Sequence, residues 1–549
     1  MAYLTTGPGG QPILILKEGT QRSRGSEARS RNIEVAVIVA EALKSALGPR
    51  GMDKMLVDSL GDLTITNDGA KILEEMELEH PIGKMIKEAA KTQEDTVGDG
   101  CTTATLLTGE LLRRSEALLD QKIHPTVIIS GFRKAEQNAL ETIADISVAV
   151  DIDDREMLRN VAMTSMSGKT IGGAAGLFSD IAIDAVRQVA ERRGDGLYVD
   201  KDNIQIVKKE GKSLQETALI RGIILDKEVV HPVMPKRVEK AKIALANAAL
   251  EIEKTEIDAE IRIRDPSNVK AFLDQEAHMI EKMVDQAKAS GANVLICQKG
   301  IDDVAQHLLA KAGILAVRRA KESDMEKLAK ATGGNIITSL NDLKADDLGE
   351  AGVVEERKIG DDKMVFVEDC KTPTAVSILI RAGLERMVEE AERAMGDAIS
   401  VVADVVQTPK VIAGGGSAEI ELARRLKAYA VKTGGREQLA IEAYSDALEV
   451  IPRTLAENAG HDPLDIMVAL RTAHEKKGGH SMGIDLSKGG IADMRKTGVF
   501  DPVKVKEHAI KTATELASMV LRIDDVIAAT KPKEGGPPTP PGGEGEEEY

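Results

Sequence analysis

The sequence predicts a multidomain α/β protein in which an α/β domain is inserted into a mostly helical domain built from both ends of the chain. The 549 residues exceed what one simple core accommodates, since a domain usually holds roughly 100–200 residues. Long helical patterns dominate before about residue 220 and after about residue 370. Between them, short strands alternate with helices. The similar pattern at the two ends favours one domain that the central part interrupts.

The N-terminal part is predicted to be mostly helical with a small β element. Residues 12–19 predict a strand, and a long amphipathic helix then continues to Gly48 and Pro49. Residues 55–73 predict a hairpin followed by a helix, because two β-rich runs flank a Gly-Asp turn. Further helices are predicted at 82–95, 102–119 and 125–144.

The central part is predicted to be a compact α/β domain. Residues 256–265 alternate in the period of a half-buried strand, and a helix then opens at Pro266. This helix places Leu273, Ile280, Val284 and Ala287 on one face. A strand, a helix and a second strand follow at 293–298, 303–313 and 314–319. The tail at 531–549 is rich in Pro, Gly and Glu, which predicts disorder.

Composition excludes several classes of function. The formal net charge of -17 provides no basic excess to displace counterions, so we expect no nucleic-acid partner. The N-terminus lacks the pattern of a signal peptide, and no apolar run is long enough to span a membrane. Three distant cysteines indicate neither a disulfide framework nor a zinc site. We therefore expect a cytoplasmic protein without a membrane partner.

Residues 97–112, VGDGCTTATLLTGELL, place a Gly-Asp-Gly turn at the start of an apolar helix. Glycine permits a tight turn and a close approach to a ligand, and the free N–H groups at a helix start attract anions. Thr102 and Thr103 add hydroxyl donors. Asp99 beside a phosphate site indicates a divalent cation, because Mg²⁺ prefers carboxylate and phosphate oxygens. The stretch favours a Mg-nucleotide site, with an ordinary capped helix as the alternative.

Two other glycine-containing stretches are candidates for contacts with the same nucleotide. SGKT at 167–170 resembles the end of a P-loop, but Met163 stands where that motif needs glycine. Lys169 is still a candidate for a γ-phosphate contact. Residues 410–426 run from a short strand through three glycines into a helix, and Glu419 replaces the third glycine of a dinucleotide fingerprint. A close approach of this backbone to ribose or phosphate is the alternative that fits.

Asp68 in TNDGA and Asp397 in RAMGDAISVV are candidates to handle an attacking water. The chain contains no HExxH motif, and no Ser-His-Asp arrangement can be identified. A non-catalytic holdase or scaffold that binds nucleotide only for structure is an alternative to an ATPase. The two acidic residues favour hydrolysis.

Taken in order, these motifs resemble those of the group II chaperonins, the family of the archaeal thermosome. The resemblance covers nearly the whole chain except the tail. Group I chaperonins share LGP, GDG and GGG, but the block at about 245–280 resembles the built-in helical protrusion of group II. The resemblance rests on SALGPRGMDKMLVD (45–58), ITNDGAKIL (65–73), VGDGCTTATLLTGELL, SMSGK (165–169), TEIDAEIRI, GDAISVV, VIAGGGSAEIELA and TGVFDPVKVK (497–506).

The resemblance implies a mostly helical equatorial ATPase domain, a small intermediate hinge domain and an α/β apical domain with a helical protrusion that serves as a lid. The implied boundaries are 1–149 and 404–530 for the equatorial domain, 150–219 and 369–403 for the intermediate domain, and 220–368 for the apical domain. The implied activity is hydrolysis of ATP to ADP with Mg²⁺, coupled to closure. The implied partners are unfolded or partly folded client proteins and identical or paralogous subunits in two stacked rings.

The resemblance also implies roles for individual residues. Asp99 would coordinate Mg²⁺, Lys169 would sense the γ-phosphate, and Asp68 and Asp397 would position and activate water, which suits phosphoryl transfer. Three positions depart from the usual family pattern: Cys101 stands in place of Thr, Gly396 in place of His, and Asp501 in place of Glu. The remaining nucleotide contacts would be Leu47, Gly48 and Pro49 in the pocket wall, Gly100, Cys101, Thr102 and Thr103 around the phosphates, Gly415 against the nucleotide and Asp501 at the ribose.

Overall fold

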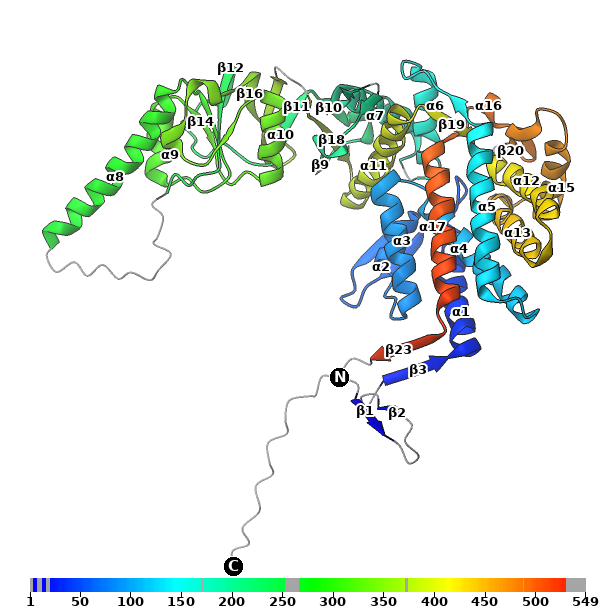
Figure 1. Ribbon diagram of the computed structural model, residues 1–549. Coiled ribbons are helices and arrows are strands. Elements are labelled where there is room, and N and C mark those ends of the chain that lie inside the picture. Colours follow the sequence, from blue (N-terminus) through cyan, green and yellow to red (C-terminus); the bar gives the residue numbers. More distant parts are fainter. Residues whose placement is uncertain are drawn as a thin grey trace, which may run out of the picture.

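The chain folds into three bodies that lie in a row, each with its own buried core (Figure 1). The computed structural model describes residues 3–6, 12–15, 20–169, 171–194, 196–251, 266–370, 374–486 and 488–529. We call the three bodies the helical body, the middle body and the distal body. In the described part of the chain, no helix combines the length and the apolar composition needed to cross a bilayer.

The helical body contains residues from both ends of the chain. Its longest helices are α1, α4, α5 and α17, and α5 begins at a start signal in the sequence, Pro125 in its first turn. Its helices are α1 (Gly25–Lys44), α2 (Gly69–Glu75), α3 (Pro81–Val97), α4 (Cys101–Asp120), α5 (Pro125–Ile146), α12 (Ser417–Thr433), α13 (Gly435–Leu448), α14 (Val450–Asn458), α15 (Pro463–His474), α16 (Met494–Thr497) and α17 (Val503–Arg522). Its strands form the pairs β1 (Tyr3–Thr6) with β2 (Pro12–Ile15), β3 (Thr20–Arg24) with β23 (Asp525–Ala529), β4 (Lys54–Val57) with β5 (Leu63–Thr66), and β20 (Met482–Ile484) with β21 (Ile491–Asp493).

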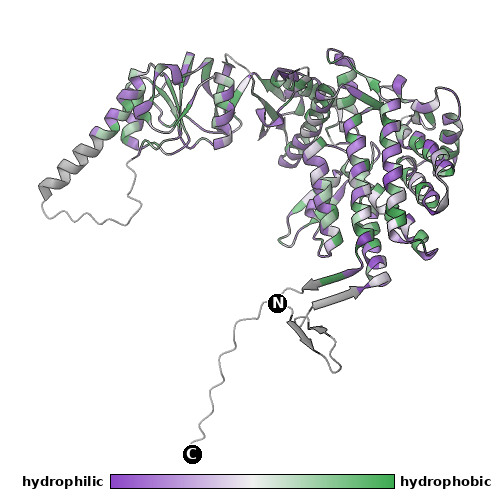
Figure 2. Cartoon of the chain, in the orientation of Figure 1, coloured by the Kyte–Doolittle hydropathy of each residue, from purple (hydrophilic) through white to green (hydrophobic). Residues whose placement is uncertain are grey.

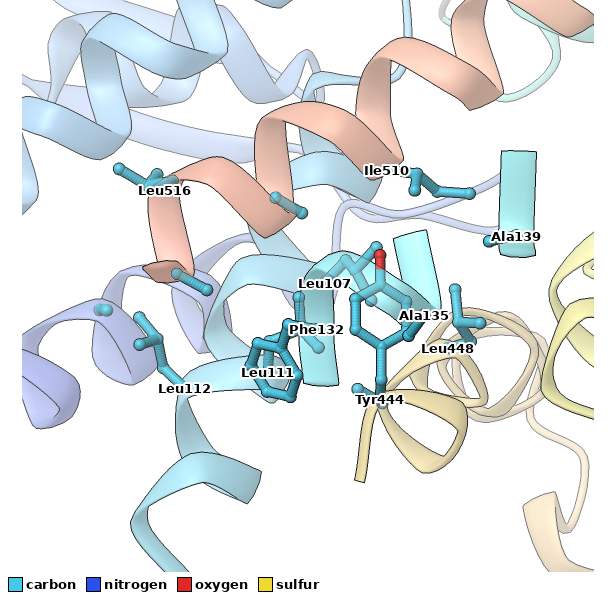
Figure 3. Close-up of a cluster of buried hydrophobic side chains, with 14 of the residues drawn as sticks. Leu107, Leu111, Leu112, Phe132, Ala135, Ala139, Tyr444, Leu448, Ile510 and Leu516 are labelled. Carbon is cyan, nitrogen blue, oxygen red and sulfur yellow. The ribbon is translucent and has the colours of Figure 1, made fainter. Parts of the chain in front are cut away.

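Aliphatic side chains from α4, α5, α13 and α17 fill the core of the helical body (Figure 3). Phe132 and Tyr444 pack edge to face there with ring centroids 5.5 Å apart. The Tyr444 hydroxyl forms a 2.7 Å hydrogen bond with Thr514, so this buried polar group is satisfied. Since Phe132 and Tyr444 are 312 positions apart in the sequence, the core joins the two ends of the chain.

The middle body packs three helices on a three-stranded sheet in the order β10-β18-β9. Its helices are α6 (Arg155–Met166), α7 (Ala175–Val189) and α11 (Glu385–Gln407), and its strands are β7 (Glu191–Arg193), β8 (Gly196–Tyr198), β9 (Ile204–Glu210), β10 (Ala218–Ile220) and β18 (Val376–Ala382). A second sheet, which we call the junction sheet, joins β6 (Val148–Ala149), β19 (Lys410–Ala413) and β22 (Phe500–Pro502) in the order β22-β19-β6. Both chain segments that lead into the helical body pass through the junction sheet.

The distal body is built on a mixed sheet in the order β11-β17-β16-β12-β13-β14. The strands β12, β13 and β14 are parallel, whereas β16, β17 and β11 add antiparallel strands at the other edge. Hydrophobic residues gather on these strands, and the surrounding helices carry both kinds of residue (Figure 2). The elements are β11 (Gly222–Leu225), β12 (Arg237–Ala246), β13 (Val294–Cys297), β14 (Leu315–Val317), β15 (Ile336–Ile337), β16 (Gly349–Ile359), β17 (Asp362–Cys370), α8 (Pro266–Ala289), α9 (Asp303–Lys311) and α10 (Glu322–Thr332).

Most of the predicted elements are confirmed, with shifted ends. The hairpin at 55–73 corresponds to β4, β5 and α2, and the helix predicted to open at Pro266 is α8. The N-terminal helix ends at Lys44, earlier than the predicted stop at Gly48. The prediction missed the antiparallel half of the distal sheet. The predicted strand at 256–265 and the tail at 531–549 lie outside the described residues, as does the second half of the strand predicted at 12–19.

Candidate nucleotide site

A cavity of about 730 Å³ lies where the helical body meets α6 and α11 of the middle body. All of the candidate site residues from the sequence line this cavity, although they come from seven separate stretches of the chain. They are Leu47, Gly48, Pro49, Asp68, Asp99, Gly100, Cys101, Thr102, Thr103, Lys169, Asp397, Gly415 and Asp501. The fold therefore gathers the candidate residues, and their individual roles stay predictions.

The Gly-Asp-Gly turn presents the start of α4 to the cavity. Gly98 and Gly100 have φ values of 69° and 85°, a left-handed conformation that favours glycine. No side chain caps α4, so the first N–H groups of the helix have no capping partner. In the described part of the chain, neither the Thr102 nor the Thr103 hydroxyl has a hydrogen-bond partner. This arrangement suits an anion such as a phosphate.

The Cys101 side chain points away from this cradle. Its thiol lies in the core of the helical body and donates to the Ala90 carbonyl oxygen of α3 at 3.3 Å. Desolvation raises the pKa of this thiol well above its ordinary value, so it stays protonated. Only the backbone N–H of Cys101 is therefore suited to contact a phosphate.

Three carboxylates surround one ammonium group in the cavity. Lys169 forms an ion pair with Asp397, and both side chains are largely buried, with 8% and 13% exposed. Desolvation disfavours the charged form of Lys169, but the carboxylates of Asp397, Asp68 and Asp99 outweigh it and raise the pKa of the lysine. The group of three carboxylates and one lysine has an excess of negative charge, which a cation would neutralise.

Desolvation also dominates the titration of the aspartates. It raises the pKa of Asp99 to about 6, with smaller contributions from Asp501 and Asp68 and with Lys169 opposing. It raises the pKa of Asp397 well above the ordinary value, again against the effect of Lys169. Asp99 accepts a 2.6 Å hydrogen bond from the Gly100 N–H. Asp68 caps α2 by accepting from the Lys71 N–H at 2.8 Å.

The loop that carries Lys169 is fixed against two of the other candidate stretches. Asn67 donates to the Gly168 carbonyl oxygen at 2.9 Å. A Cβ at Gly168 would lie 2.8 Å from the Pro49 Cα, so only glycine fits between this loop and Pro49. The helix α6 precedes the loop, whereas a P-loop follows a strand. The P-loop alternative is therefore wrong.

The glycines after β19 and the side chain of Asp501 form another wall. Gly415 and Gly416 have φ values of 62° and 76°. A Cβ on Gly415 would lie 2.7 Å from the Met494 Sδ, so the backbone packs tightly there. Asp501 lies on β22 opposite Ile412 of β19, which places it beside the glycine turn.

Sequence reasoning missed several residues that line the cavity. Glu94 lies on α3, where desolvation and the carboxylates of Asp68 and Asp95 raise its pKa to about 7. Lys506 lies in the first turn of α17. It is the last residue of TGVFDPVKVK (497–506), but the sequence indicated no role for it. One wall is apolar, as a planar base requires. It contains Leu47, Ile451, Leu455, Ile484, Leu486 and Met494. Apart from Leu47, which the sequence analysis placed in the pocket wall, these isolated apolar residues carry no local signal that distinguishes a cavity wall from a core.

An uncapped helix start, a group of carboxylates and an apolar wall define a nucleotide-binding protein in which two bodies share one site. The chain belongs to the TCP-1/cpn60 chaperonin family, whose family model matches residues 39–531. It is 57% identical to a thermosome subunit beta of Sulfurisphaera tokodaii over 97% of each chain. It is also 57% identical to a thermosome subunit beta of Thermococcus kodakarensis, over 96% of this chain and 97% of the relative. As a member of this family the chain binds nucleotide, hydrolyses ATP and assists protein folding.

Proposed function

We propose that the cavity holds Mg-ATP with its phosphates at the start of α4 and its base against the apolar wall, and that Asp68 and Asp397 direct a water onto the γ-phosphate. The observation that carries this proposal is the convergence of all the candidate residues on one cavity. Leu47, Gly48 and Pro49 would line the pocket, Gly100, Cys101, Thr102 and Thr103 would cradle phosphates, Gly415 would pack on the nucleotide, and Asp501 would bind the ribose.

The residues present fit a magnesium ion that is held jointly by protein and phosphates. The described residues contain no group of three or more His, Cys, Asp or Glu arranged as a metal site. Mg²⁺ at a nucleotide needs only one or two carboxylates besides phosphate oxygens and water. Asp99 is the proposed ligand, and desolvation of this buried carboxylate raises its pKa although Lys169 opposes the shift. When bound, the metal would neutralise negative charge on the phosphates.

The pair of Lys169 and Asp397 supports a role for both in hydrolysis. Lys169 is paired with Asp397, so a γ-phosphate would compete with this carboxylate for the ammonium. Release from Lys169 would leave Asp397 free to accept a proton from water, and its raised pKa suits a general base. Asp68 belongs to the helical body, where it caps the start of α2.

Because Lys169 and Asp397 belong to the middle body, attraction of the Lys169 ammonium to the γ-phosphate would draw that body toward the helical body. Moving a ring from ~1% to ~99% closed needs about 5.5 kcal/mol of differential binding. Charge-assisted contacts in several subunits would supply it. The proposed domains are an equatorial ATPase domain at 1–149 and 404–530, an intermediate domain at 150–219 and 369–403, and an apical domain at 220–368. The buried cluster of the middle body extends past 403 to Val411.

The proposed partners are unfolded or partly folded clients and other subunits of the same kind in two stacked rings, in the cytoplasm. The relatives are subunits by name. The hairpin of β4 and β5 supports assembly, because it exposes the hydrophobic side chains of Met55, Val57, Leu63 and Ile65. Nucleic acid and membranes are not among the proposed partners.

The proposal is tested by the substitution Asp397→Asn, which keeps the size of the side chain but removes its charge. We expect nucleotide affinity to change little, and steady-state phosphate release with Mg-ATP to fall about 100-fold or more. Glu392→Gln is the matched control, because Glu392 lies on the same helix but pairs with Lys208 outside the cavity. Unchanged phosphate release by Asp397→Asn would contradict the role of Asp397.

A further inference from the structure

Lys506 is a buried cation in the nucleotide cavity whose role is still unassigned. It lies in the first turn of α17 and lines the cavity with a side chain that is 13% exposed. Its Nζ contacts Glu419 Oε1 of α12 at 2.7 Å and Asp501 Oδ2 of β22 at 3.0 Å. Lys506 therefore links the helices α17 and α12 of the helical body to β22 of the junction sheet.

The contact with Lys506 involves only one of the two carboxylate oxygens of Asp501. Oδ2 faces the ammonium, and the same oxygen lies 3.3 Å from where a Cβ on Gly414 would be. The carboxylate is thus held between Lys506 and the glycine turn. Within the described ranges, no hydrogen bond to Oδ1 of Asp501 is present. Oδ1 is therefore the oxygen that is left to accept a hydrogen bond from a ligand.

Glu419 anchors Lys506 on the side away from Asp501. Its side chain is buried on α12, and in the described structure its Oε2 has no hydrogen-bond partner. A buried carboxylate is costly without a compensating charge, so Lys506 stabilises Glu419 as well as Asp501. Desolvation opposes the charged form of Lys506, but Asp501 and Glu419 outweigh it and raise the pKa of the lysine. Lys506 is therefore held in its charged form.

A phosphate would have to compete with two carboxylates for Lys506. At Lys169 the corresponding competition involves one directly paired carboxylate, Asp397. The geometry thus favours a role in which Lys506 acts on the nucleotide through Asp501 and does not contact a phosphate itself.

We propose that Lys506 is a positioning residue that orients Asp501 toward a ribose hydroxyl and so sets the preference of the site for ribonucleotides over deoxyribonucleotides. This inference rests on the proposed function, in which Asp501 binds the ribose. A site built to hydrogen-bond a hydroxyl discriminates strongly against an analogue that lacks it, because the partner group is then left buried and unpaired. Discrimination between ribonucleotides and deoxyribonucleotides therefore depends on how firmly the Asp501 carboxylate is held.

The experiment compares dissociation constants for ATP, 2′-deoxy-ATP and 3′-deoxy-ATP, measured by calorimetry on the full chain. We expect the wild type to bind ATP at least about tenfold more tightly than the weaker-binding of the two analogues. Lys506→Gln should reduce this ratio to below about threefold, and Lys506→Arg should largely restore it, since Arg keeps the charge. A merely structural role would weaken the binding of all three nucleotides and leave the ratio unchanged, which would overturn the proposal.

Asp501→Asn separates failure of this inference from failure of the proposed ribose contact. If Asp501→Asn leaves the ratio unchanged, the ribose contact itself is wrong. If Asp501→Asn collapses the ratio and Lys506→Gln does not, only the role of Lys506 is wrong. Should Lys506→Gln fail to fold, as judged by circular dichroism, Lys506→Gln with Glu419→Gln removes the buried cation together with one carboxylate. We expect the same reduced ratio in that double variant, and an undiminished ratio would overturn the proposal.

Discussion

Asp99 shows how one buried side chain couples ion binding to pH. Its carboxylate lies in the cavity, and desolvation is the main reason that its pKa is raised to about 6, with the charge of Lys169 opposing. A metal ion binds the ionised form, so protons and metal compete for this side chain. This competition makes metal binding depend on pH, and the dependence can be measured at pH values at which the protein is folded.

We predict that Mg-ADP affinity falls as the pH drops below about 6. Protonation of Asp99 removes the ligand, and affinity then declines by up to about tenfold per pH unit. Because the nucleotide phosphates also titrate, the control is Asp99→Asn, which retains only the nucleotide contribution. Calorimetric titrations of both proteins between about pH 5 and pH 8 should give a steeper decline for the wild type. Parallel curves would show that Asp99 is not a metal ligand.

At the scale of single residues, the short glycine-containing motifs made most of the cavity residues predictable from the sequence. Glycines next to small polar residues indicate a place where backbone meets a ligand, and this signal identified Gly100, Thr102 and Gly415 correctly as cavity residues. It could not show that the Cys101 thiol turns toward Ala90, because that depends on the packing of α3 against α4. Lys506 was missed for a similar reason, since a lysine near the start of a helix is usually a solvated surface group.

Single positions within the helices determine how well these elements are formed. Gly396 lies inside α11, where a Cβ would meet no atom within 4 Å. Gly109 lies inside α4, where a Cβ would lie 2.4 Å from the Ala40 Cβ of α1. The two glycines share a helical conformation but differ in the space around them.

We predict opposite effects for Gly396→Ala and Gly109→Ala. Alanine restricts the unfolded chain and favours helix, so Gly396→Ala should raise the free energy of unfolding by about 0.5–1 kcal/mol. Gly109→Ala should lower it by roughly 1–3 kcal/mol, because α1 and α4 must move apart. Urea unfolding monitored by circular dichroism measures both. Equal effects of the two substitutions would contradict this explanation.

The contact of α12 with α15 depends on a buried carboxylate. Glu421 on α12 accepts hydrogen bonds from Arg424 and Arg425 of the same helix, and its Oε2 lies 3.2 Å from His474 Nδ1 of α15. Desolvation would raise the pKa of Glu421, but these hydrogen bonds outweigh it and hold the pKa well below the usual range. The carboxylate therefore stabilises the fold in its ionised form.

We predict that Glu421→Gln lowers the free energy of unfolding by about 3 kcal/mol at neutral pH, since it breaks a buried charged network. A carboxylate with a lowered native pKa contributes fully above its unfolded pKa of about 4.3 and loses this contribution as pH falls toward the native value. The difference between wild type and variant should thus be constant above about pH 5 and shrink below pH 4. Chemical unfolding over this range measures it, and a difference that grows in acid would contradict the assignment.

The elements themselves were predictable where periodicity and start signals agreed. The helix predicted at 125–144 is found at Pro125–Ile146, because proline at the first turn marks its start. The antiparallel strands β16 and β17 were not predicted, since their pairing depends on partners far away in the sequence. Local patterns reveal the type of an element but not its neighbour in a sheet.

At the scale of the whole molecule, two chain crossings connect the helical body with the middle body. Both pass through the junction sheet, in which β6 and β22 flank β19. Asp501 lies on this same sheet, and Asp397 and Lys169 reach the cavity from the middle body. A ligand in the cavity thus contacts both bodies and the sheet between them. The sequence indicated that the ends of the chain form one body, but not that the site lies at a junction.

The hairpin of β4 and β5 leaves the helical body with an uncovered hydrophobic surface. Met55 pairs with Ile65 and Val57 pairs with Leu63, so these four side chains share one face of the two strands. All four are exposed, and Leu60 at the turn is 86% exposed. A two-stranded hairpin is marginally stable alone, and an exposed apolar strand pair is suited to pairing with another chain. A closed ring requires head-to-tail contacts, and this face is our candidate for one side of them.

We predict that Val57→Asp prevents assembly and leaves the subunit folded. Val57 is exposed in the single chain, so the substitution should change the circular dichroism and the unfolding midpoint little, whereas burial of a charge between subunits is costly. Leu464→Asp is the matched control, because Leu464 is at least as exposed as Val57 but lies on α15, away from the hairpin. Light scattering after size-exclusion chromatography should show a large assembly for the wild type and for Leu464→Asp, and a much smaller species for Val57→Asp. An unchanged mass for Val57→Asp would exclude the hairpin face from the subunit contact, and a smaller mass for both variants would show that added charge alone prevents assembly.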